Sequence, residues 1–157
     1  MDIKFPTVTV LPATASININ GTVGATTPST VAATTISATG SVSDAAGDVR
    51  LIPANSQSAA YTLVLADAGK HIFHPAADTT ARTFTIPANA SVAYTIGTAI
   101  TIINQNSAGV VTIAITSDTM RLAGAGTAGS RTLAANGVAT AIKITSTEWI
   151  INGAGLT

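Results

Sequence analysis

The two histidines of the chain, His71 and His74, are the first residues to consider for chemistry, because imidazole is a common metal ligand. In a strand, the spacing His-x-x-His places the two rings on opposite faces, whereas a helical metal site favours positions i and i+4. A metal shared on a three-fold axis would need only one ring from each subunit. We nevertheless expect turn or interface histidines, no metal site and no cofactor.

The acidic residues offer a second kind of chemistry. Asp67 and Lys70 flank one predicted turn, and Asp118 and Arg121 flank another. Catalysis by two carboxylates requires the pair to converge, but the acids here stand singly among small neutral residues, which favours local ion pairs or Asx turns. No Gly-x-Ser-x-Gly elbow is present, and no lysine follows the glycines of residues 124–130 as in a phosphate loop. The sequence therefore predicts a protein that is not an enzyme.

Three aromatic residues are candidates for binding. Trp149 lies in Glu-Trp-Ile-Ile, a context that favours a core or oligomer-interface anchor, and we assign the same role to Tyr61 and Tyr94. The alternative is a platform on which a sugar ring stacks. Exposure of these rings would favour that alternative, and their burial would weaken it.

The elements that must position these residues are short strands. Runs rich in Val, Ile and Thr alternate with turn signals built from Gly, Asn and Asp, and no long helix is predicted. This pattern predicts an all-β fold, a β-sandwich or jelly-roll-like domain of short antiparallel strands over residues 48–157. Alternation places Ile113, Ile115, Ile142 and Ile144 on inward faces. The expected strands cover residues 49–52, 60–65, 71–74, 83–86, 92–96, 99–104, 110–117, 119–123, 130–133, 139–145 and 148–151.

A repeated phrase accompanies these strands. Residues 52–55 and 86–89 both read Ile-Pro-Ala-Asn and lead into segments that contain Tyr61 and Tyr94, and residues 133–136 form a looser copy, Leu-Ala-Ala-Asn. Proline and asparagine are typical of tight turns, so each copy predicts a hairpin. The first two copies start 34 residues apart, but the third does not keep that spacing. A regular solenoid or propeller is therefore disfavoured.

Composition indicates an assembly. Hydrophobic residues make up 46% of the 157 residues, but aromatic residues only 4%, so the core must be built from small aliphatic side chains. Charged residues are 9% and the formal net charge is zero. A dispersed monomer normally carries more charge, so we expect burial against other copies of the chain. The scattered Lys and Arg residues argue against nucleic acid as a partner.

Targeting signals and cysteines are lacking in the sequence. The chain has no apolar run of about 18 residues and no signal-peptide core, which predicts synthesis in a cytoplasm and no membrane partner. Without cysteine there are no disulfides and no thiolate sites. Stability must therefore come from packing and assembly.

Residues 1–47 differ from the remainder and predict an extended N-terminal arm rich in Thr, Ala and Ser. Apolar residues punctuated by prolines suit an extended strand that lies along a partner's sheet edge. The candidate anchoring residues of this arm are Ile3, Phe5, Val8, Val10 and Leu11.

Residues 61–71, 82–89, 122–141 and 148–153 together resemble a β-module of structural proteins from tailed bacteriophages. The resemblance spans roughly residues 50–157 and does not cover the arm. It implies a trimer-prone part of a virion, of the kind found in capsid decoration proteins, head fibres and tail fibres. It brings no catalytic motif with it.

We therefore expect a capsid decoration, or cement, protein on the outer surface of the capsid, assembled in the host cytoplasm. Its partners would be the major capsid protein and other copies of itself, most simply as a homotrimer. The alternative is a head-fibre or tail-fibre tip that binds a host-surface glycan. Ice binding, suggested by Thr-x-Thr at residues 7–9 and 83–85, ranks lower because these motifs are irregularly placed.

Overall fold

The computed structural model describes residues 42–44, 47–48 and 51–157, which all belong to one compact unit, Ala38–Thr157. Strands β1 (Ser43–Asp44) and β2 (Gly47–Asp48) form an antiparallel pair. Nine further strands form one curled mixed sheet, so the predicted all-β fold is confirmed. Their bounds are β3 Ala54–Ser56, β4 Tyr61–Thr62, β5 His71–His74, β6 Arg82–Ile86, β7 Ala99–Asn104, β8 Val111–Ile115, β9 Thr119–Leu122, β10 Arg131–Lys143 and β11 Glu148–Leu156.

Successive strands from β3 to β8 alternate between two arms of this sheet. Strands β3, β5 and β7 pair side by side in parallel in the first arm, and β4, β6 and β8 do so in the second. The prediction of antiparallel strands is therefore wrong for this half of the domain. The path of the chain through these strands resembles a short solenoid with turns of unequal length. The repeated phrase in the sequence therefore has no fixed spacing.

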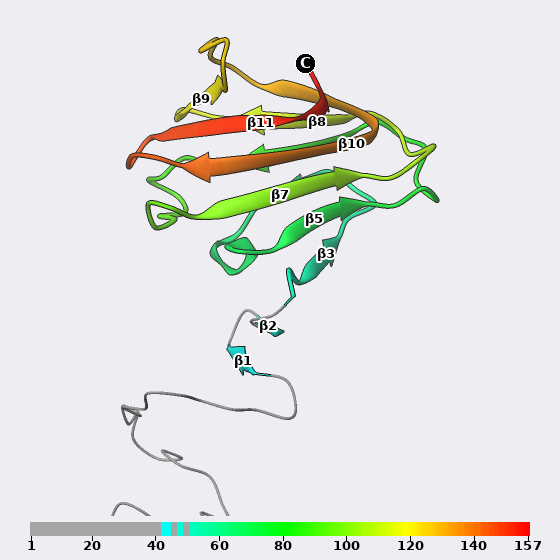
Figure 1. Ribbon diagram of the computed structural model, residues 1–157, viewed down its shortest axis with the longest axis horizontal. Helices are drawn as coiled ribbons and strands as arrows, with labels where there is room; N and C mark the ends of the chain where they lie inside the picture. Colours follow the sequence, from blue (N-terminus) through cyan, green and yellow to red (C-terminus); the bar gives the residue numbers. More distant parts are fainter. Residues whose placement is uncertain (1–41, 45–46, 49–50) are drawn as a thin grey trace, which may run out of the picture. The chain divides into compact units, whose positions relative to one another are not determined.

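Strand β10 joins the two arms. Residues 138–142 pair antiparallel with β7, whereas residues 131–133 pair antiparallel with β8. The register shifts between these halves, and Asn136 there adopts the left-handed region at φ 63°. Figure 1 shows β10 between β7 and β11. Because one strand belongs to both arms, the sheet curls around its core.

The repeated asparagines occupy three unlike positions. Asn55 lies inside β3, Asn89 lies in a turn after β6, and Asn136 lies at the bend of β10. The prediction of three similar hairpins is therefore wrong, since only Asn136 uses the left-handed conformation that the turn argument invoked.

The inner faces of both arms share one hydrophobic core. Phe84 of β6, Ile113 of β8, Ile102 of β7 and Trp149 of β11 are fully buried in it. At Gly153, β11 approaches β10 so closely that an added Cβ would lie 2.2 Å from the carbonyl oxygen of Val138. The core is aliphatic apart from a few rings, as the composition predicted.

The predicted boundary between the N-terminal arm and the β-domain, at residues 47 and 48, stays a prediction. The five candidate anchoring residues of the arm lie outside the described residues.

Candidate functional site

The side chains of β10 that face the core are the opposite set from the one predicted. Ala139, Ala141 and Lys143 point into the core, and Ile142 and Ile144 are 41% and 43% exposed. The prediction that these two isoleucines face inward is therefore wrong. Because side chains alternate across a strand, the isoleucines lie on the outer side of the first arm.

The outer side of the first arm carries ordered rows of side chains across β5, β7, β10 and β11. One apolar row joins Phe73, Ile103 and Val138, and a second joins Ala99, Ile142 and Ile150. Between them runs a polar row of His71, Thr101, Thr140 and Asn152, in which the two threonine hydroxyls lie 3.0 Å apart. We call these three rows the outer face.

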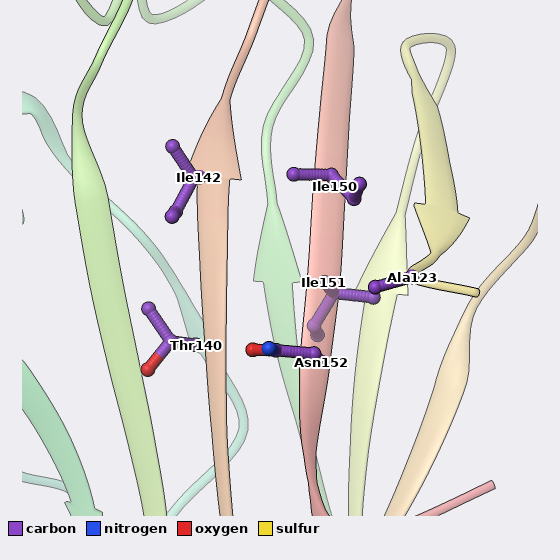
Figure 2. Close-up of a pocket in the computed structure, with 6 residues that line it drawn as sticks. All are labelled: Ala123, Thr140, Ile142, Ile150, Ile151 and Asn152. Carbon is purple, nitrogen blue, oxygen red and sulfur yellow. The ribbon is translucent and has the colours of Figure 1, made fainter.

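The second apolar row borders a shallow hollow. Figure 2 shows Thr140 and Ile142 on β10 beside Ile150 and Asn152 on β11, with Ala123 toward the edge of the sheet. Ile151 completes its lining. The hollow is lined mostly by hydrocarbon, so a protruding apolar side chain of another protein would fit it better than a charged ligand would.

The margin of the outer face is charged. Arg121 of β9 stands in register with Ile150 and forms an ion pair with Glu148 at the start of β11. An uncharged centre with a polar rim is the usual anatomy of a protein–protein interface. The outer face is therefore the candidate functional site of the described residues.

The aromatic candidates lie elsewhere. Trp149 is fully buried and meets Tyr94, which is 3% exposed, edge to face with ring centroids 5.6 Å apart. Tyr61 is half-buried and donates its hydroxyl proton to Asp67 at 2.8 Å. Trp149 and Tyr94 therefore act as core anchors in the single chain, and neither ring is exposed for a sugar to stack on.

Burial changes the acid–base behaviour of both tyrosines. Loss of solvation raises the pKa of Tyr94, with a smaller contribution from the negative charge of Asp67. Burial also raises the pKa of Tyr61, and its hydrogen bond to Asp67 adds to the effect. Asp67 itself is buried and accepts from Asn55 and from the backbone N–H of Val64. The carboxylate of Asp67 thus accepts three hydrogen bonds, which stabilise the turn before β5.

The two histidines lie on opposite faces of β5, as predicted. His71 belongs to the outer face and its Nδ1 lies 3.0 Å from the carbonyl oxygen of Ile52. His74 is buried, and its ring nitrogens lie 2.9 Å from Asn104 Oδ1 and 3.1 Å from Asp78 Oδ2. Within residues 42–44, 47–48 and 51–157, no three potential metal-binding side chains gather in one place.

Asp78 is the centre of the polar cluster around His74. Arg82 donates two hydrogen bonds to its carboxylate, at 2.7 and 3.1 Å, and the backbone N–H of Thr80 donates a third. These bonds, led by those from Arg82, hold the pKa of Asp78 far below its ordinary value of 3.8. The cluster therefore favours the ionised carboxylate in the folded chain.

The lowered pKa predicts an acid-dependent loss of stability. Below about pH 4 the unfolded chain binds a proton at Asp78 that the folded chain does not, so the stabilisation present above that pH is lost as pH falls. Asp78→Asn should therefore reduce the difference between the urea midpoints at about pH 6 and about pH 3. Equal pH dependence of the variant and the natural chain would contradict this role, and Asp44→Asn is the control for removal of an acid.

Asp118 and Arg121, which flank the second predicted turn, have other partners than each other. Arg121 pairs with Glu148 of β11, whereas Asp118 accepts from the backbone N–H of Asn89 at 3.0 Å. Sequence proximity suggested a pair between residues 118 and 121, but the parallel pairing of β9 with β11 brings the more distant glutamate closer. The glycines of residues 124–130 form the turn before β10, where Gly124, Gly126 and Gly129 have positive φ.

Helices that could cross a membrane are absent from the described part of the chain. In comparisons with known proteins, neither a protein-family model nor a curated protein matches this sequence.

Proposed function

We propose that the chain is a structural protein of a tailed-bacteriophage virion, and that it decorates and stabilises the outer surface of the capsid. The β-domain would associate with other copies of itself, most simply as a trimer. The N-terminal arm would bind the major capsid protein. Binding without catalysis is all that this role requires.

The outer face is the observation that supports this proposal best. Its two apolar rows cross adjacent strands of the sheet, and the Arg121–Glu148 ion pair lies at its margin near β9. Together with the low charge of the whole chain, this arrangement favours burial against other copies. The resemblance to phage structural modules supplies the context in which such burial would operate.

The proposed mechanism combines weak contacts between copies of the β-domain with weak contacts between the N-terminal arm and the shell. Each N-terminal arm would add backbone hydrogen bonds and apolar contacts at a strand edge of the shell. Arms connected through one oligomer bind with avidity, because every contact after the first is intramolecular. Neighbouring capsomers would thus be held together against internal pressure.

Removal of residues 1–20 tests the role of the arm. The shortened chain should keep the β-sheet signal in circular dichroism and the oligomeric mass of the full chain, but should no longer sediment with purified capsids. The matched control replaces residues 1–20 by a Gly/Ser segment of equal length, which preserves reach but removes the apolar contacts. Capsid binding as strong as that of the full chain would contradict the proposed mechanism.

A further inference from the structure

The side chain of Lys143 is almost entirely buried, at 1% exposure. Its Nζ donates to Asn89 Oδ1 at 2.6 Å and lies 5.5 Å from the centroid of the Trp149 ring. Among the described residues, no carboxylate forms an ion pair with it. Buried lysines are normally paired with an acid, so this amine with a neutral amide partner needs an explanation.

The amide partner is itself next to an acid. Asn89 lies in the turn after β6, and its backbone N–H donates to Asp118 Oδ2 at 3.0 Å. The side chain of Asp118 is in turn 9% exposed. Three segments far apart in sequence therefore meet at a half-buried turn, where Lys143 contacts the side chain of Asn89 and Asp118 contacts its backbone.

Hydrogen bonds fix the backbone of Lys143 on β10. The N–H of Lys143 donates to Thr98 at 2.9 Å, its carbonyl accepts from Gly97 at 2.8 Å, and its cross-strand neighbour is Trp149. Nζ lies 2.6 Å from Oδ1, the oxygen bonded to Asn89 Cγ. Fixing two reacting groups in this way replaces an encounter by an intramolecular step, which can accelerate a reaction by many orders of magnitude.

We propose that Lys143 and Asn89 form an intramolecular isopeptide bond after the chain has folded. The buried ammonium group would be replaced by a neutral secondary amide. The electrostatic penalty of a buried cation without an ion pair would thereby be removed.

The step balances without an oxidant or any other reactant. Asp118 lies beyond ion-pair distance of Nζ, so the ammonium of Lys143 passes one proton to its carboxylate through a bridging water, and the resulting amine attacks Asn89 Cγ. The Nζ–Cγ bond forms as the carbonyl electrons move to Oδ1, and the Cγ–Nδ2 bond breaks when they return. Nδ2 takes one proton from Nζ and, through the same bridging water, a second from Asp118, and leaves as ammonium. The carboxylate of Asp118 is thus regenerated.

The bond would connect β10, which belongs to both arms of the sheet, to the loop after β6. It would close a loop between residues 54 positions apart in the chain. A covalent link of this kind restricts the unfolded chain, as a disulfide does, in a protein that has no cysteine. A cross-linked domain would also resist unfolding under mechanical load.

Mass spectrometry of the full purified chain tests the proposal. The intact mass should be lower than the sequence mass by one ammonia. Trypsin should leave Lys143 uncut and release residues 83–121 covalently joined to residues 132–157, with fragment ions that assign the junction to Asn89 and Lys143. A folded chain of unaltered sequence mass, with these two peptides separate, would overturn the proposal.

Three variants separate this reaction from other losses of ammonia. Lys143→Met and Asn89→Ala should have full sequence mass, and Asp118→Asn, which still accepts a hydrogen bond, should fold but lose most of the cross-link. Asn152→Ala, which removes an exposed asparagine followed by glycine, should keep the cross-link in full. An undiminished loss of ammonia in Lys143→Met would assign that loss to another residue and would also overturn the proposal.

Discussion

Replacement of Trp149 by alanine is expected to lower the free energy of unfolding by about 3–5 kcal/mol. The indole ring is fully buried, packs edge to face on Tyr94 and has its centroid 5.5 Å from Lys143 Nζ. Its removal leaves a cavity between β10, β11 and the loop that carries Tyr94. Since small domains are stable by only about 5–15 kcal/mol, this single change should remove a large part of the total.

Urea unfolding followed by far-ultraviolet circular dichroism would measure the effect of Trp149→Ala, because the chain has only one tryptophan and the variant has no indole fluorescence. Trp149→Phe is the matched control: it retains a ring against Tyr94 and should lose much less stability. An unchanged midpoint for Trp149→Ala would show that the ring does not anchor the core.

If copies of the chain associate through the outer face as proposed, the double variant Ile142→Lys, Ile150→Lys should convert the oligomer into monomers while leaving the domain folded. These residues are cross-strand neighbours in the second apolar row of the outer face, and Ile142 is already 41% exposed in the single chain. Two adjacent ammonium groups would repel one another and their counterparts in a second copy, and would lose solvation on association. Sedimentation velocity over a range of protein concentrations would measure the change in mass.

Val110→Lys is the matched control for this double variant. Val110 is 43% exposed but lies directly before β8, in the second arm, so its replacement adds a lysine without altering the outer face. The oligomeric mass of this control should equal that of the natural chain. If the double variant kept the same mass as well, the outer face would not be the subunit contact.

Several elements could be predicted from the sequence because alternation and turn residues coincide there. The predicted strands 71–74 and 99–104 agree with β5 and β7 at both ends. Residues 92–96 were expected to form a strand but form a loop, since Tyr94 turns into the core to meet Trp149 and to donate to the carbonyl of Val64. A tertiary contact thus outweighs local strand propensity.

Strand pairing and the orientation of β10 could not be predicted in this way. Alternation defines two faces of a strand, but both faces of residues 138–144 contain apolar side chains, so the pattern does not say which one is buried. Ala139 and Ala141 face inward because Trp149 fills the adjacent space. Lys143 also faces inward because Asn89 accepts a hydrogen bond from its amine. Those partners come from distant segments. The outer face and the Lys143 site were therefore missed for the same physical reason.

The copy number of the chain in purified phage particles tests the central claim most directly. Quantitative mass spectrometry with isotope-labelled peptides of this chain and of the major capsid protein would give the ratio of the two. A decoration protein that covers the shell should be present in numbers comparable with those of the major capsid protein. A handful of copies in each particle would contradict that role and would favour a fibre tip, and absence from the particle would contradict a virion role altogether.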